Sequence, residues 1–106
     1  MMKKEDEILV HKFTDRVRSL FPEAGIWIFG SRARGNPVSG SDLDVLVVLE
    51  QVNPQIDRDI RNIAWEIGYE NEIVITTLLL EKEEFERGPM SESSIVANIL
   101  REGVQT

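Results

Sequence analysis

The chain has 106 residues, of which 42% are hydrophobic and 29% are charged, a composition typical of a globular protein with one core of modest size. It has no cysteine, which excludes a disulfide framework and a thiolate metal site, and no apolar run approaches the roughly 18 residues that a membrane span needs. The formal net charge of −7 disfavours a nucleic-acid-binding module, because such modules neutralise backbone phosphates with a basic face. We therefore expect a single cytoplasmic domain over residues 1–106.

The first half of the chain predicts a helix followed by two strands. Apolar residues recur at helical spacing over residues 5–20, and Pro22 closes this helix. Residues 26–29 are strand formers that end abruptly at a glycine. After a loop rich in glycine, serine and proline, residues 43–49 predict a second strand whose apolar centre is typical of an inner strand. The short connection between the two strands favours antiparallel pairing.

The second half predicts a helix, a strand and two further helices. Asn53 is a good cap with Pro54 at the first helical position, and an apolar stripe continues from there to a stop at Gly68. Trp65 falls beside this stripe, so we expect it to be partly buried. Three segments follow: a strand over residues 72–80, a short helix over 81–87, and a helix over 91–102 with Ile95, Val96, Ile99 and Leu100 inward. The order α-β-β-α-β-α predicts an α+β fold, a small mixed sheet with helices packed on it.

The first strand ends in a segment suited to holding phosphate. Gly30 lets the backbone approach a ligand closely, and the residues after it can open a short helix whose free N–H groups point at an anion. The hydroxyl of Ser31 adds another donor for a phosphate oxygen. Arg32 and Arg34 bring cationic guanidinium groups nearby, and Gly35 releases the chain into its turn.

Two aspartates at the start of the second strand are suited to holding a metal ion. Asp42 and Asp44 lie two residues apart, so their side chains project from the same face of a strand. Neighbouring carboxylates are costly unless a cation or a proton stands between them. Hard oxygen ligands at this spacing suit Mg²⁺, which also takes ligands from substrate phosphates. Together the two segments predict phosphoryl or nucleotidyl transfer.

At these residues the sequence resembles the minimal nucleotidyltransferase family, small relatives of the DNA polymerase beta superfamily. The family pattern is Gly-Ser-x-x-x-Gly, followed about half a dozen residues later by Asp-x-Asp. The matching residues are Gly30, Ser31, Gly35, Asp42 and Asp44, together with Arg32, Arg34 and Ser41, which are frequent in the family. The order of elements also fits over nearly the whole chain.

The resemblance implies transfer of a nucleoside monophosphate, AMP from ATP in the first instance, to a hydroxyl acceptor. It implies two Mg²⁺ ions, with Mn²⁺ as a substitute, and pyrophosphate as the leaving group. It also implies a helical HEPN-type partner, with this chain as the antitoxin of a toxin–antitoxin pair. A domain this short needs that partner or a second copy, as in a homodimer, to complete its site. The acceptor stays open between a protein tyrosine, a nucleic-acid end and a small molecule.

The family also has a third carboxylate, on the strand after the middle helix, which acts as general base and helps to hold a metal ion. That predicted strand has no aspartate, and Glu72 at its start, with Glu70 behind it, is the candidate. The alternative is that Glu72 is a solvated residue at the strand end. In that case the chain is a nucleotide-binding antitoxin subunit that turns over poorly or not at all. A purely structural interaction domain is the third alternative, although it leaves the two motifs unexplained.

Overall fold

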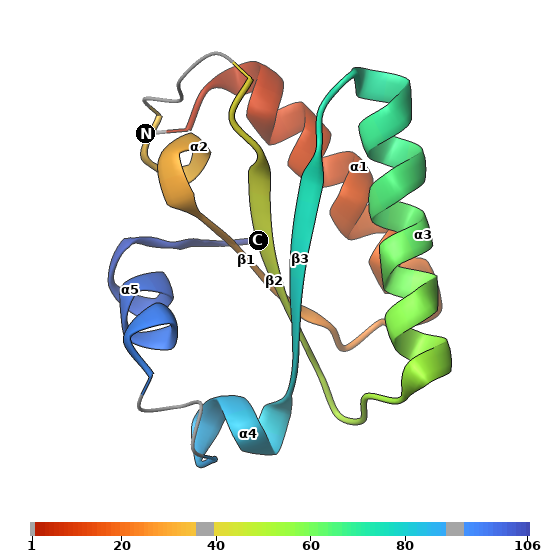
Figure 1. Ribbon diagram of the computed structural model, residues 1–106, viewed down its shortest axis with the longest axis vertical. Coiled ribbons are helices and arrows are strands. Elements are labelled where there is room, and N and C mark those ends of the chain that lie inside the picture. The colour runs from red at the N-terminus through yellow and green to blue at the C-terminus, as the bar shows by residue number, and fades with distance from the viewer. Residues whose placement is uncertain (1, 36–39, 89–92) are drawn as a thin grey trace.

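The computed structural model describes residues 2–35, 40–88 and 93–106. Its elements in chain order are α1 (Lys4–Leu20), β1 (Gly25–Phe29), α2 (Gly30–Arg34), β2 (Leu43–Leu49), α3 (Pro54–Asn71), β3 (Ile75–Glu81), α4 (Lys82–Glu86), α5 (Ser94–Glu102) and β4 (Val104–Gln105). The predicted α+β fold, a small mixed sheet with helices packed on it, is confirmed (Figure 1). No helix in the described ranges is both long enough and apolar enough to cross a membrane.

The strands form one sheet in the order β3-β2-β1-β4. The predicted antiparallel pairing of the first two strands is confirmed, with Ile28 opposite Val45. β3 runs parallel to β2, which requires a crossover connection, and α3 supplies it. β4 pairs antiparallel with β1 at the other edge of the sheet. The short β4 was not predicted, because two exposed residues carry no periodic signal.

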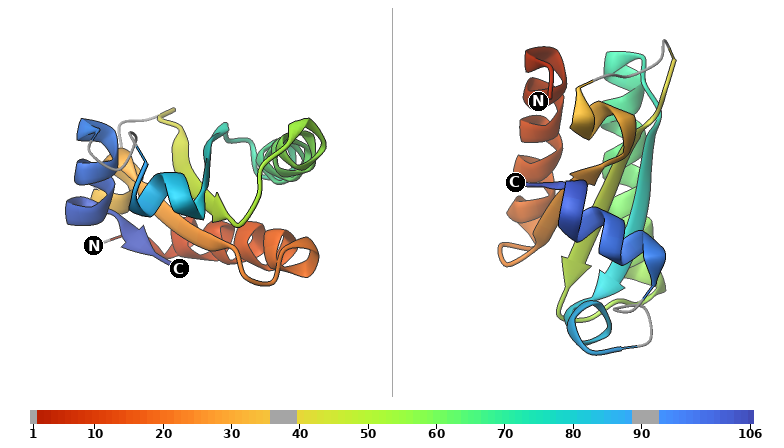
Figure 2. Two further views of the ribbon diagram at one scale, coloured as in Figure 1. Left: turned by 90° about the horizontal axis from the view of Figure 1, so that it is seen from below. Right: turned by 90° about the vertical axis from the view of Figure 1, so that its left-hand side faces the viewer.

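Helices cover both faces of the sheet, which explains why β2 is apolar throughout. On one face α1 and α3 pack against alternate strand residues, among them Leu43, Val45 and Val47. On the other face Leu46 and Val48 pack with α5, through Val96 and Ile99. Figure 2 shows α1 and α5 on opposite sides of the sheet. The inner strand therefore has no solvated side, as the sequence predicted.

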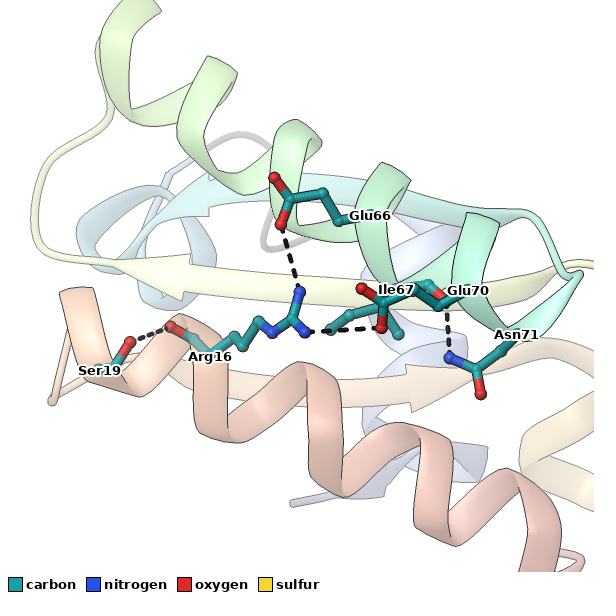
Figure 3. A network of polar contacts seen from close by, with 6 residues as sticks. All are labelled: Arg16, Ser19, Glu66, Ile67, Glu70 and Asn71. Carbon is teal, nitrogen blue, oxygen red and sulfur yellow. Dashed lines mark hydrogen bonds and ion pairs between the residues drawn. The ribbon is translucent and has the colours of Figure 1, made fainter.

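Polar contacts link α1 and α3, the two helices on one face of the sheet (Figure 3). Arg16 of α1 lies 3.2 Å from the Glu66 carboxylate and 3.6 Å from that of Glu70, both on α3. Near the end of α3, the Asn71 side-chain amide donates to the Ile67 carbonyl at 2.7 Å. The ion pairs are exposed and each contributes at most about 1 kcal/mol. The alignment of the two helices therefore rests mainly on the apolar cluster beneath them.

The end of α3 differs from the prediction. The helix continues past Gly68 to Asn71, and Glu72 takes the left-handed conformation beyond it, with φ of 56°. Gly68 is buried, and a methyl group there would meet the Ile73 carbonyl oxygen. The glycine therefore serves close packing inside the helix, and the strand begins at Ile75 rather than at Glu72.

Two predictions of burial are wrong. Trp65 is 67% exposed, because it lies outside the stripe that faces the sheet. On α5, Ile95 and Leu100 are 41% and 52% exposed, whereas Val96 and Ile99 are fully buried. A nine-residue helix lying on the sheet buries only a narrow stripe. The expected start of this helix at residues 91 and 92 lies outside the described residues.

Candidate functional site

The candidate site lies at the end of the sheet where β1 finishes and β2 begins. Antiparallel pairing sets Phe29 opposite Asp44, which places the next residue, Gly30, beside the aspartate. Gly30 has φ of +78°, and a Cβ atom built on it would overlap the Asp44 carboxylate oxygen Oδ2. The register of two strands thus brings the glycine of one segment and an aspartate of the other into direct proximity.

α2 follows immediately and carries the remaining residues of the first segment. Ala33 is buried and anchors this short helix to the core. Gly35 ends it in a left-handed conformation, with φ of 81°. Ser31, the residue directly after Gly30, is partly buried at the start of the helix. The backbone of Gly30 and the hydroxyl of Ser31 therefore lie at the same end of the sheet as Asp44.

The two aspartates share the face of the sheet opposite α1 and α3. Leu43 and Val45 are fully buried against those helices, so the alternation along the chain turns Asp42 and Asp44 to the other side. Asp42 is exposed and Asp44 is partly buried. Neither carboxylate forms an ion pair with a residue in the described part of the chain.

On the strand next to Asp44, the neighbouring residue is a threonine and not a third carboxylate. Thr76 of β3 is in register with Asp44, and its hydroxyl donates to Asp44 Oδ1 in a short hydrogen bond. The next residues of β3 on this face are Leu78 and Leu80, which belong to the apolar cluster under α5. On the part of β3 beside Asp44, this face of the sheet therefore has no carboxylate.

Glu72 occupies a different place from the one expected. It caps α3, three residues before β3 begins, and lines a small hollow of 260 Å³ together with Asp6 and Arg32. Glu72 also lines a groove between α3 and β3 that reaches Thr76. Among the residues that the structure describes, no three aspartate, glutamate or histidine side chains are grouped closely enough to hold a metal ion. The structure thus does not bring Glu72 together with Asp42 and Asp44.

Arg32 is occupied by contacts within the protein. Its Nη1 donates to Oδ1 of Asp6 at 2.8 Å, and its Nε donates to the Ser41 carbonyl at 2.9 Å. The Asp6 side chain is only 4% exposed, so this is a largely buried charge pair. Arg32 therefore joins α2 to α1 and to the segment that leads into Asp42.

The other two predicted nucleotide-binding residues differ in their surroundings. Arg34 is exposed on α2, with its Nη1 at 3.8 Å from a Glu102 carboxylate oxygen. Ser41 is partly buried, and its hydroxyl has no hydrogen-bond partner among the described residues. Ser41 is thus held through its carbonyl by Arg32, while its side chain keeps its hydrogen-bonding capacity.

The residues present fit a hard divalent cation. Asp42 and Asp44 supply oxygen ligands, and no cationic side chain among the described residues pairs with them. Asp44 Oδ2 faces a space that any residue larger than glycine would fill. Such a donor set suits Mg²⁺ or Mn²⁺. No sequence pattern indicated Thr76, because its position beside Asp44 depends on the register of two strands separated by a helix. Asp6 was missed because acidic residues in a first helical turn are usually solvated.

Comparison with known families gives a match over most of the chain. The family model described as the nucleotidyltransferase domain matches residues 10–104. No curated protein matches the sequence.

Several solved structures share the fold. A Sulfolobus solfataricus protein assigned as a nucleotidyltransferase is 24% identical, with a TM-score of 0.55 over 92% of this chain and 75% of that chain. A toxin–antitoxin structure with AMP-PNP is 20% identical, with a TM-score of 0.61 over 90% and 69%. A Shewanella oneidensis complex of a tri-AMPylated HEPN toxin with its MNT antitoxin is 18% identical, with a TM-score of 0.56 over 93% and 69%. Identities this low establish the fold alone.

Proposed function

Because this chain belongs to the nucleotidyltransferase domain family, we propose that it transfers a nucleoside monophosphate, AMP in the first instance, from a nucleoside triphosphate to a hydroxyl group. The observation that carries this proposal is the proximity of the Gly30 backbone to the Asp44 carboxylate. A phosphate held at Gly30 would lie next to a cation held at Asp44. This juxtaposition is what transfer of a nucleotidyl group needs.

We assign the roles as follows. Asp42 and Asp44 hold Mg²⁺, which supplies charge neutralisation to the triphosphate when it is bound. Gly30 and Ser31 donate to phosphate oxygens, and Arg34 adds positive charge at the exposed side of α2. Arg32 acts indirectly, because its contacts with Asp6 and Ser41 hold α2 and the approach to Asp42 in place. Thr76 orients Asp44 through Oδ1 and leaves Oδ2 toward Gly30.

We further propose that the acceptor hydroxyl belongs to a helical partner of the HEPN type, and that this chain acts as an antitoxin. Support comes from two fold relatives, a toxin–antitoxin structure described as MntA–HpeT and the Shewanella complex of a tri-AMPylated HEPN toxin with an MNT antitoxin. The hydroxyl attacks the α-phosphorus, the acceptor becomes adenylated, and pyrophosphate leaves.

A second candidate function is a nucleotide-binding antitoxin subunit with little or no turnover. One observation favours it: Thr76, rather than a carboxylate, stands beside Asp44 on β3. Without a base at that position, the acceptor proton must pass to a group of the partner or to solvent. Both candidate functions include binding of a nucleotide and a metal ion. They differ only in whether the nucleotidyl group is transferred to an acceptor.

The test uses ATP labelled at the α-phosphate, Mg²⁺ and the HEPN-type partner. We expect label on the partner with the wild-type chain and none with the double variant Asp42→Asn/Asp44→Asn. A matched control is Asp59→Asn, a partly buried residue near the start of α3, which should transfer as the wild type does. Equal labelling by the double variant contradicts the assignment of the site. Binding of ATP and Mg²⁺ by calorimetry without label transfer would support the second candidate.

A further inference from the structure

An open groove runs between α3 and β3 at one edge of the sheet. It has a volume of 1110 Å³, with Arg61, Trp65 and Tyr69 on the helix side and residues 73–77 on the strand side. Thr76 takes part in both regions, whereas Arg61, Trp65 and Tyr69 belong to α3, on the face of the sheet opposite the aspartates. The groove therefore adjoins the nucleotide site at the edge strand, and its helix side lies away from that site.

Large apolar side chains are exposed along this groove. Trp65, Tyr69 and Val74 are 67%, 75% and 61% exposed. The two rings stack on each other, with centroids 5.3 Å apart and planes 13° apart. Stacked aromatic residues on a surface, next to an exposed valine, are typical of a protein–protein interface.

The strand that borders the groove has an unprotected edge. In the described part of the chain β3 pairs with β2 alone, and residues 73–80 contain no charged residue and no proline. The Val74 carbonyl accepts from Leu43, so the alternation of the backbone turns the N–H and C=O groups of Ile75, Thr77 and Leu79 outward. Edge strands in monomeric proteins are normally protected by charges, proline or a bulge. This edge is suited to pairing with another strand.

The charges of the groove identify a second copy of the chain as the occupant. Arg61 lies at one end, and Glu70 and Glu72 lie at the other. Arg61 is paired with Asp57, and Glu70 with Arg16. Both ion pairs are exposed, so breaking them to form new pairs costs little free energy. α3 runs antiparallel to β3 (Figure 1). A twofold axis perpendicular to β3 therefore also reverses α3 in the second copy, which sets the basic end of each groove against the acidic end of the other. A surface that complements itself in this way is the mark of a twofold dimer.

We propose that two copies form a homodimer in which their β3 strands pair antiparallel about a twofold axis near Thr77. The sheets then continue into each other, and Trp65 and Tyr69 of both copies pack across the axis. The contacts across the axis come from the free edge of β3 and from α3, so this dimer does not depend on the proposed function.

The test is sedimentation velocity on the full chain over micromolar concentrations, without partner or nucleotide. We expect a species of about 24 kDa, twice the chain mass of 12.1 kDa. Trp65→Ser and Thr77→Pro should each raise the dimer dissociation constant at least about tenfold. The proline removes an N–H that points away from β2, so the monomer keeps its ladder of hydrogen bonds.

A charge exchange gives the sharpest control. Arg61→Glu should weaken the dimer, and the double variant Arg61→Glu/Glu70→Arg should restore it by exchanging the two ends of the groove. Arg101→Glu, on α5, changes the net charge as much as Arg61→Glu and should leave the dimer unchanged. A wild-type chain that stays at 12.1 kDa throughout overturns the proposal. So does a dimer that Trp65→Ser, Thr77→Pro and Arg61→Glu all leave intact.

Discussion

At Gly30 the chain turns from β1 into α2 with φ of +78°, and its α-carbon faces the Asp44 carboxylate. We expect Gly30→Ala to abolish binding of Mg²⁺ and ATP, because the added methyl group displaces the carboxylate. We also expect it to lower the free energy of unfolding by about 1–3 kcal/mol, because alanine is strained at positive φ. Calorimetry measures the first effect and urea unfolding the second.

Gly40 separates these two effects. Its φ is +80°, but a Cβ atom there would meet nothing within 4 Å. Gly40→Ala should therefore carry the backbone strain without disturbing Asp44, and should lose stability while it keeps nucleotide affinity. Equal loss of affinity in both variants would mean that strain alone, and not proximity to the carboxylate, is responsible.

Thr76 is the residue at which we expect turnover to be decided. In Thr76→Asp a carboxylate would stand in register with Asp44, able to hold the metal and to take the acceptor proton. We expect faster label transfer from ATP to the partner in the presence of Mg²⁺. We also expect lower stability without Mg²⁺, because the two neighbouring carboxylates then repel each other.

The companion variant is Glu72→Gln. Because Glu72 caps α3 before β3 begins and is not grouped with Asp42 and Asp44, we expect its loss to leave the transfer rate unchanged. A transfer rate that falls in Glu72→Gln and does not rise in Thr76→Asp would indicate that Glu72 is the general base.

At the scale of elements, α2 is held between the core and α1. Ala33 buries one side of this five-residue helix, and the Arg32 guanidinium reaches the Asp6 carboxylate on α1. So short a helix is not stable by itself, and its position depends on these tertiary contacts. The candidate phosphate-binding residues are therefore positioned by α1, an element that has no part in the motif.

We expect Asp6→Ala to lower the free energy of unfolding by about 2–3 kcal/mol, because it leaves the mostly buried Arg32 charge without its carboxylate. Nucleotide affinity should fall as well, since Arg32 also holds the Ser41 carbonyl. Urea unfolding and calorimetry measure the two effects. Glu50→Ala removes an exposed pair with Lys82 and should change stability by no more than about 0.5 kcal/mol. Similar small effects of both variants would contradict the anchoring role of Asp6.

At the scale of the whole molecule, one arginine joins segments far apart in the sequence. Arg18 at the end of α1 donates to the Ala24 carbonyl at 3.2 and 3.1 Å, and to the Thr106 carbonyl at 2.7 Å. Thr106 in turn donates its N–H to the Ile26 carbonyl at 2.9 Å. These bonds fasten the end of the first helix to the strand β1 and to the residue after β4.

We expect Arg18→Ala to lower the free energy of unfolding by about 1–3 kcal/mol, because charged hydrogen bonds to partly buried carbonyl groups are lost. Amide hydrogen exchange should accelerate first in β4, which has only β1 as a neighbour in the described structure. Arg101→Ala, an exposed arginine bonded to Asn98, is the control and should change neither quantity. Unchanged exchange in β4 would mean that the strand is held by its pairing with β1 alone.

The elements whose signal is local could be predicted from the sequence. The apolar stripe of α1, the strand β2 and the Asn53 cap of α3 follow from the periodicity of neighbouring residues, and the cap is observed, with Asn53 Oδ1 accepting from the Ile56 N–H at 2.8 Å. The end of α3 could not be predicted in this way. A glycine at Gly68 signals a helix end in sequence, whereas here it allows the Ile73 carbonyl to pack against the helix.

The same distinction between local sequence signals and tertiary contacts applies to the candidate site. The sequence by itself determined the two segments around Gly30 and Asp44, because each is a short run of residues whose chemistry can be recognised without knowledge of the fold. Only the tertiary structure decided that Thr76 stands beside Asp44, that Arg32 is bound to Asp6, and that Glu72 caps α3 and does not join Asp42 and Asp44. These relations depend on strand register and helix packing between residues distant in the chain, and such contacts are set by the burial of the whole core rather than by any local pattern.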